Sequence, residues 1–314
     1  MQPGKEMTMT PPERAQNSLA IWLMIALLAL IWAGSFLFGR IIMLEWPPIS
    51  VAFLRVLIAA AALWLFVLAT GRKIKITKTF AISLLGMGML NNVIPFSLIL
   101  YGQTEIGSGL ASVVNAMTPI WTLIIANQLT ADEKITTNRS VGIIFGFLGV
   151  ALLIGSDFLN GLTASAWAQA AVLLATLSYG FAGVFGKRFK SEDPVIVATG
   201  QLTASTIIML PMAFMLESPL SLPAPSTELV VSLFGLAIIC TSLAYILFFH
   251  ILAKAGATYV SLVTFLIPVG AIGMGYLFLS ETLSLNNFLG TSLILLGLLA
   301  IDGRFFQYIR NKLA

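Results

Sequence analysis

One arginine lies inside an otherwise apolar stretch of the sequence. Arg55 stands about seven residues into the run Pro48–Ala69, on the order of 10 Å along a helix axis from its beginning. A charge at such depth in a membrane helix is costly unless it faces a polar cavity or a partner. Its guanidinium could hold a solute carboxylate through a bidentate fork, or act as a cation in an outer gate. A structural ion pair with Glu45 or Glu105 is the alternative, and the sequence leaves both open.

Polar residues also occur just before prolines inside apolar runs. Pro119 and Pro268 each remove one backbone hydrogen bond and free the carbonyl four residues earlier, at Asn115 and Thr264. Free carbonyls beside polar side chains are tolerated at membrane depth only where they line a cavity or another helix. We expect Asn115 and Thr264 to line a solute cavity, with kinks at both prolines. Side chains that satisfy only their own kinked helices are the alternative.

A pair of amides precedes a third proline. Asn91 and Asn92 lie in an apolar run shortly before Pro95, where a further kink is expected. Two buried amides need hydrogen-bond partners and are costly without them. Cavity lining is the favoured role, and adhesion between helices is the alternative.

Aromatic and hydroxyl side chains complete the candidate cavity, since rings suit an apolar or cationic solute. His250, the only histidine, could couple transport to protons, although a lone histidine near the end of a span is more often interfacial. The further cavity candidates are Trp32, Ser35, Tyr101, Trp121 and Tyr179.

Several classes of chemistry find no support in the sequence. One cysteine and one histidine cannot form a disulfide framework or a multi-cysteine or two-histidine metal site. No GxxxxGK[ST] loop occurs, so ATP is not the expected source of energy. A membrane enzyme would need clustered acid, base or metal-ligand residues at membrane depth, where only Arg55 is clearly ionisable. We therefore expect no enzyme activity, no metal and no cofactor, and a proton or counter-solute as the coupled partner.

The elements that must position these residues are apolar runs of membrane-spanning length. Of the 314 residues 58% are hydrophobic and 10% are charged, and the mean hydropathy is +0.97, far from the values of a soluble domain. Runs of about 20 apolar residues predict transmembrane helices. The ten predicted spans are Leu19–Gly39, Pro48–Ala69, Phe80–Leu100, Ile106–Leu129, Val141–Ser156, Ala166–Gly186, Val195–Met215, Leu229–Phe249, Ala257–Leu279 and Phe288–Phe306.

The basic residues predict the orientation of these spans. With a cytoplasmic N-terminus, fifteen of the seventeen Lys and Arg residues lie on the cytoplasmic side, as the positive-inside rule requires. The outer loops keep only Arg40. Both termini are then cytoplasmic, with a disordered tail at residues 1–18 and a second tail at 307–314. The net charge of +4 needs no nucleic acid as a partner, and the lipid bilayer and a small solute are expected instead.

The sequence contains an internal repeat, and its two similar halves are predicted to span residues 19–156 and 157–306. Because each half holds five spans, an odd number, the second half enters the membrane inverted. Inverted repeats are typical of carriers that work by alternating access, with the solute bound near the midplane. The counterpart of Arg55 falls near Gln201 and Leu202 and carries no charge, which favours a functional role for Arg55. Matched pairs include Glu133/Glu281, Asn138/Asn286, Gly142/Gly290, Gly149/Gly297, Pro47/Pro194, Gly39/Gly186, Gly107/Gly256 and Pro119/Pro268.

The chain resembles the drug/metabolite transporter superfamily, in its EamA type with two five-helix repeats. The resemblance extends from Leu19 to Phe306 and is carried by "IWAGSFLFGR", "FLRVLIAA", "LNNVIPFSLILYGQTEIGSGLASVVNAMTPIWT" and "LSETLSLNNFLGTSLILLGLLAIDG". It implies an arginine at the place of Arg55. It also implies transport of amino acids, amines, carboxylates or related metabolites, without fixing the solute.

The favoured hypothesis is a secondary transporter that moves a small organic metabolite by alternating access through a central cavity. An amino acid, an amine or a carboxylate is expected as solute, export is favoured over uptake, and a bacterial inner (plasma) membrane is the expected location. A channel or a receptor-like sensor is the alternative, as is a nucleotide-sugar or drug transporter among carriers. A diphosphate would invite several fixed cations, and the spans hold one. The solute, the coupling ion and the oligomeric state stay open.

Overall fold

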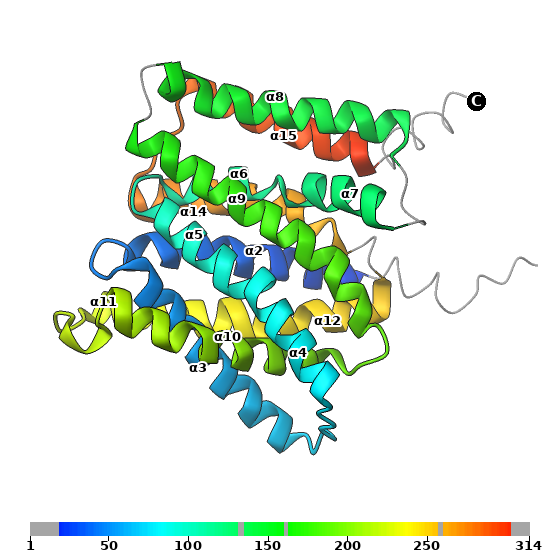
Figure 1. The fold of residues 1–314 in the computed structure, drawn as a ribbon. Helices are drawn as coiled ribbons and strands as arrows, with labels where there is room; N and C mark the ends of the chain where they lie inside the picture. Colours follow the sequence, from blue (N-terminus) through cyan, green and yellow to red (C-terminus); the bar gives the residue numbers. More distant parts are fainter. Residues whose placement is uncertain (1–18, 131–134, 160–162, 257–259, 303–314) are drawn as a thin grey trace, which may run out of the picture.

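The computed structural model describes residues 19–130, 135–159, 163–256 and 260–302, and the regular structure in them is helical (Figure 1). In this part of the chain nine helices are long and apolar enough to cross a membrane, and Val263–Leu279 is a shorter apolar helix. The predicted all-helical, polytopic fold is therefore confirmed. The predicted tails at 1–18 and 307–314 lie outside the described residues.

Five spans form each half. The first half contains α2 (Leu19–Ile42), α3 (Pro48–Ala69), α4 (Lys78–Gly88), η1 (Met89–Val93), α5 (Ile94–Gln103), α6 (Ser108–Asn115), α7 (Thr118–Leu129) and α8 (Thr137–Leu159). The second half contains α9 (Ala164–Phe185), η2 (Gly186–Phe189), α10 (Pro194–Leu216), η3 (Pro219–Ser221), α11 (Thr227–Phe234), η4 (Gly235–Leu243), α12 (Ala244–Ala255), α14 (Val263–Leu279) and α15 (Leu285–Asp302).

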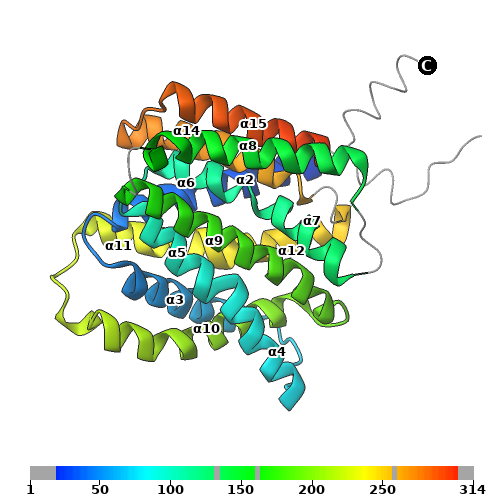
Figure 2. The same cartoon turned by 45° about the horizontal axis from the view of Figure 1, so that its top comes forward.

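The helices of the two halves interleave. The repeat counterparts α3 and α10 pack against each other, and so do the counterparts α8 and α15. α2 packs on α14, and their repeat counterparts α9 and α7 pack on each other in the same way. Figures 1 and 2 both show α8 and α15 side by side along one edge of the bundle. The halves are therefore related by an approximate two-fold axis, and both contribute to each of the two large hydrophobic cores.

Glycines set the distance between α8 and α15. A Cβ added at Gly142 would lie 2.4 Å from the carbonyl oxygen of Gly297, and one added at Gly149 would lie 2.7 Å from that of Gly290. Gly142 is the repeat counterpart of Gly290, and Gly149 of Gly297, so the four glycines pair crosswise about the axis. Close backbone approach through small residues is the usual way for membrane helices to pack.

Two counterpart spans contain a π-helix near their middle. η1 joins α4 to α5, and η4 joins α11 to α12. In η4 the hydroxyls of Thr241 and Ser242 donate to the carbonyls five residues earlier, at 2.8 and 3.2 Å. After η1, Pro95 occupies the first turn of α5, where its missing N–H is tolerated. Short π-helices are uncommon and often occur at functional sites.

The prolines of spans four and nine act differently. Pro119 lies in the first turn of α7, directly after a break at Ala116–Met117 that ends α6. Pro268 lies inside α14, which continues through it. The irregular turn in span nine falls earlier, at Ser261–Leu262. The kink expected at Pro268 stays a prediction. The turn at Ser261–Leu262 is closed by Thr264, whose hydroxyl and N–H both donate to the Ser261 carbonyl.

Candidate functional site

The side chain of Arg55 lies between the halves, only 7% exposed. Its Nε donates to Oγ1 of Thr241 in η4 at 3.0 Å, and Nη2 reaches Oγ of Ser35 at 3.4 Å. Its Cζ atom lies 3.6 Å from the ring centroid of Phe96. Among the described residues no carboxylate lies within ion-pair distance of this guanidinium, and Nη1 donates no hydrogen bond to them.

The structural ion pairs considered for Arg55 are therefore not formed. Glu45 instead accepts hydrogen bonds from the backbone and hydroxyl of Ser226, at the beginning of α11. Glu105 lies exposed after α5. Arg55 is thus a buried cation whose partners among the described residues are all neutral. Such a cation is stabilised when an anion binds beside it.

The two predicted amides make a second set of contacts across the halves. Asn91 donates to Oε1 of Gln201 in α10 and to the hydroxyl of Tyr245 in α12, both at 3.3 Å. Asn92 is fully buried, donates to Ser205 at 3.0 Å and accepts from the hydroxyl of Tyr245 at 3.1 Å. These amides are therefore satisfied by the second half of the chain.

The contacts of Arg55 and of the amides form one group, which we call the central polar cluster. It is placed by α2, α3, η1, α10, η4 and α12, so both halves contribute. The approximate two-fold axis relates its parts: α3 bonds to η4 through Arg55, and α10 bonds to η1 through Gln201. Its members are Ser35, Arg55, Asn91, Asn92, Gln201, Ser205, Thr241 and Tyr245.

Aromatic rings and a thiol border this cluster. Tyr179, Tyr245 and the thiol of Cys240 are near enough to interact electrostatically with Arg55. Tyr179 also packs against both of the large hydrophobic cores. Trp32 lies further along, with its ring 5.6 Å from that of Phe248. Ser35 thus belongs to the central polar cluster, and Tyr179 and Trp32 lie beside it.

Other predicted cavity residues lie away from the cluster. Tyr101 is 50% exposed near the end of α5, and His250 is exposed on α12. Thr264 donates to the carbonyl of Ser261, in the turn just before α14. Asn115 and Trp121 flank the break in span four, and neither Oδ1 of Asn115 nor Nε1 of Trp121, both buried, finds a partner among the described residues.

Several members of the cluster were not predicted as site residues. A shift of 149 residues, which aligns Tyr101 with His250, also aligns Asn92 with Thr241 and Phe96 with Tyr245. That shift was therefore a usable signal for Thr241 and Tyr245. The sequence places the counterpart of Arg55 near Gln201 and Leu202, but it does not mark Gln201 as a site residue, because an amide in a membrane helix is less unusual than a charge.

The two halves are also tied at the ends of α3 and α10. At the end predicted to be outside, the amides of Ile49 and Ser50 donate to the carboxylate of Glu217, at 3.1 and 2.6 Å. At the other end Arg72 forms an ion pair with Asp193, which also caps α10. A carboxylate at a helix N-terminus is stabilised by the free N–H groups there. The α3–α10 pair is therefore fastened on both sides of the cluster.

The fold and cluster define a multi-pass membrane protein with two inverted five-span repeats. The model of the EamA-like transporter family matches residues 19–155 and again 166–301. The chain belongs to the EamA-like transporter family, whose members are transporters rather than enzymes.

Curated relatives and a solved structure agree with this assignment. The uncharacterized transporter YoaV of Bacillus subtilis (strain 168) is 27% identical over 93% of this chain and 99% of its own length. The uncharacterized inner membrane transporter YedA of Escherichia coli (strain K12) is 27% identical over 87% of this chain and 88% of its own. A solved crystal structure at 16% identity superposes with a TM-score of 0.65, over 90% of this chain and 96% of that one, and so shares the fold.

Proposed function

We propose that this transporter is a secondary carrier of a small organic solute that bears a carboxylate, such as an amino acid or a simple carboxylic acid. The observation that carries the proposal is the buried guanidinium of Arg55, which meets only neutral partners among the described residues. A solute carboxylate bound through Nη1 and Nη2 would supply the missing counter-charge. Buried charges in membrane helices are retained where they bind a substrate or an ion.

The surroundings of Arg55 suit a small solute with an apolar or amino end. The cluster offers hydrogen-bonding groups from Asn91, Gln201 and Tyr245, and the rings of Tyr179 and Trp32 lie beside it. A ring face can hold an ammonium group as well as an apolar one. An α-amino acid would use both kinds of contact, whereas a diphosphate would leave most of its charge uncompensated.

In alternating access, the hydrogen bonds of the central polar cluster would link solute binding to movement between the two halves. Arg55 is held by η4 of the opposite half, and its counterpart Gln201 is held by η1 in the same way. Rocking of one half against the other would break one set of contacts and leave the solute facing the other side of the membrane. No nucleotide is needed for such a cycle, so exchange or a proton gradient would drive it. We place the carrier in a bacterial inner membrane, with export as the favoured direction.

Counterflow in liposomes tests the proposal. Purified protein is reconstituted into vesicles preloaded with an amino acid, an amine or a carboxylate, and uptake of the same labelled compound is followed. We expect accumulation against the gradient for carboxylate-bearing solutes and none for simple amines. Accumulation of amines alone would contradict the role of Arg55. Flux without counterflow would indicate a channel, and binding without flux would indicate a sensor.

A further inference from the structure

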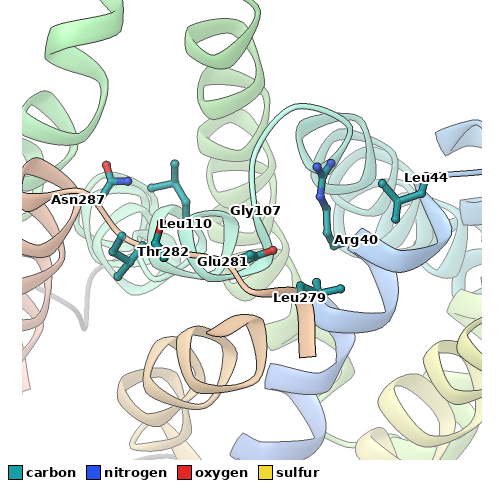
Figure 3. Close-up of a pocket in the computed structure, with 9 residues that line it drawn as sticks. Arg40, Leu44, Gly107, Leu110, Leu279, Glu281, Thr282 and Asn287 are labelled. Atoms are coloured by element: carbon teal, nitrogen blue, oxygen red, sulfur yellow. The ribbon is translucent and has the colours of Figure 1, made fainter. Parts of the chain in front are cut away.

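We propose that a pocket between Arg40 and Asn287, distinct from the central polar cluster, is a second site that binds the carboxylate group of a small solute. The pocket lies where α2 ends and α15 begins, at the end of the molecule predicted to face outward. Figure 3 shows the pocket in close-up. The inference rests on the proposed function only for the choice of carboxylate as ligand. The site itself is built from residues that the central cluster does not use.

The pocket has the size of a site for a small molecule. Its volume is about 400 Å³, within the range of known ligand sites. Figure 3 shows Arg40 on the end of α2, Asn287 on the first turn of α15, and the loop between α14 and α15 passing between them. Both halves of the chain therefore contribute to its wall. The remaining lining residues are Leu44, Gly107, Leu110, Leu279, Glu281, Thr282 and Leu283.

Arg40 is a fixed cation with unused donors. Its Nη1 donates to the carbonyls of Gln103 and Thr104, which end α5, the second of them at 2.9 Å. These bonds hold the guanidinium in place. Its Nε and Nη2 donate to no described residue, and no described carboxylate lies within ion-pair distance. A guanidinium with two adjacent free donors matches the two oxygens of a carboxylate.

The other charged side chain in the wall, Glu281, already has hydrogen-bond partners for both of its carboxylate oxygens. Its carboxylate accepts hydrogen bonds from the amide and hydroxyl of Ser108 and from the amide of Gly109, at 2.7 to 3.1 Å. These groups begin α6, where the helix dipole favours a negative charge. A Cβ at Gly107 or Gly275 would lie within 2.7 Å of the Glu281 side chain, so the carboxylate is closely enclosed. The charged group of the pocket that keeps unused hydrogen-bonding atoms is therefore the guanidinium of Arg40.

The position of Arg40 in the sequence points the same way. Under the predicted orientation it is the one basic residue of the outer loops, against the trend that places cations inside. The repeat shift that aligns Gly39 with Gly186 aligns Arg40 with Lys187, so a cation follows the same glycine at each end of the bundle. A cation kept on the outer side is explained by a ligand that it binds there.

Protection of Arg40 from an arginine reagent tests the site without relying on transport. Protein in liposomes is treated with phenylglyoxal, and the adduct on each arginine is quantified by peptide mass spectrometry. Acetate, succinate and glycine serve as probes, with chloride at equal ionic strength as reference and ethylammonium as a cationic control. We expect modification of Arg40 to slow about tenfold at a probe concentration of ten times Kd. Equal rates with and without carboxylate would overturn the proposal.

Matched variants separate the pocket from the central cluster. Asn287→Asp adds a negative charge to the pocket without touching the bonds of Arg40, and protection should be lost. Asn286→Asp adds the same charge at the exposed neighbouring position, which does not line the pocket, and protection should remain. Arg55→Gln should also leave protection of Arg40 intact. Protection that disappears in Arg55→Gln would show that the pocket is no independent site. If counterflow fails while carboxylates still protect Arg40, the proposed function is wrong and the pocket remains supported.

Discussion

Nε of Arg55 and Oγ1 of Thr241 lie 3.0 Å apart, in a buried hydrogen bond that joins the first half of the chain to the second. Gln201, the counterpart of Arg55, is bonded across the halves to Asn91 at 3.3 Å. Each half thus places a side chain on the π-helix of the other. Any movement of one half against the other must change the surroundings of the buried cation, which links solute binding to conformation.

Replacement of Arg55 should weaken solute binding. Arg55→Gln removes charge-assisted hydrogen bonds worth about 1.5–3 kcal/mol, or roughly 10- to 150-fold in affinity. Arg55→Lys keeps the charge but loses the planar fork, so it should restore part of the affinity at most. The measurement is the concentration dependence of counterflow, together with binding to solubilised protein.

Arg188→Gln is the matched control for this experiment. Arg188 also stacks on an aromatic ring, with its Cζ 3.4 Å from the ring centroid of Phe185, but it is exposed and lies at the opposite end of the bundle from Glu217. Its removal should leave affinity unchanged. Equal losses in both variants would mean that Arg55 acts through general stability rather than through the solute.

Removal of the Tyr245 hydroxyl should destabilise the protein. In Tyr245→Phe, Asn91 loses one of its two acceptors and the buried amide oxygen of Asn92 loses its donor, at an expected cost of about 1–3 kcal/mol. Thermal unfolding in detergent measures the change. Tyr276→Phe removes a hydroxyl from a residue that is 65% exposed, and no shift is expected there. Tyr245→Phe with unchanged unfolding would show that these hydrogen bonds contribute nothing to stability.

Much of the fold could be predicted from the sequence, because hydropathy and repetition act over many residues. Ten apolar runs and one internal shift were enough for the spans and for the inverted halves. The π-helices were not predicted, since they depend on side chains such as Thr241 and Ser242 that bond to carbonyls five residues earlier. The spacing of apolar residues along a helix does not reveal where a few turns widen into a π-helix.

The candidate site was less predictable than the fold. Arg55, Asn91 and Asn92 stood out because charges and amides are costly in apolar spans. Tyr101 and His250 were attractive for their chemistry, yet the structure leaves both exposed, since a span end does not reveal which face of the helix is inward. The pocket at Arg40 depends on a loop between distant helices, and no spacing in the sequence brings Asn287 to it.

The single cysteine offers a reporter of the central cluster. Cys240 is 2% exposed and lies near Arg55, so a maleimide can reach its thiol only when the halves open. In solubilised protein without a gradient, a transported solute at ten times its Kd should slow labelling about tenfold by occupying the cluster. Ser221→Cys in a Cys240→Ser background places a thiol at an exposed position away from both proposed sites, and it should label rapidly with or without solute. Labelling of Cys240 that ignores the solute would place the binding site elsewhere.

The glycine contacts between α8 and α15 predict opposite effects for two similar substitutions. In Gly142→Ala the new methyl would meet the carbonyl of Gly297 at 2.4 Å and Cγ1 of Ile301 at 2.6 Å, so the helices must separate. Overpacking of this kind costs about 1–3 kcal/mol, more than the roughly 1 kcal/mol that alanine gains over glycine in a helix. Gly273→Ala in α14 meets nothing within 4 Å and should keep the helical gain alone. Thermal unfolding should therefore shift down for the first variant and up or not at all for the second. A rise in both would show that α8 and α15 can move apart without cost, and that the crosswise glycines do not fix the two-fold packing of the halves.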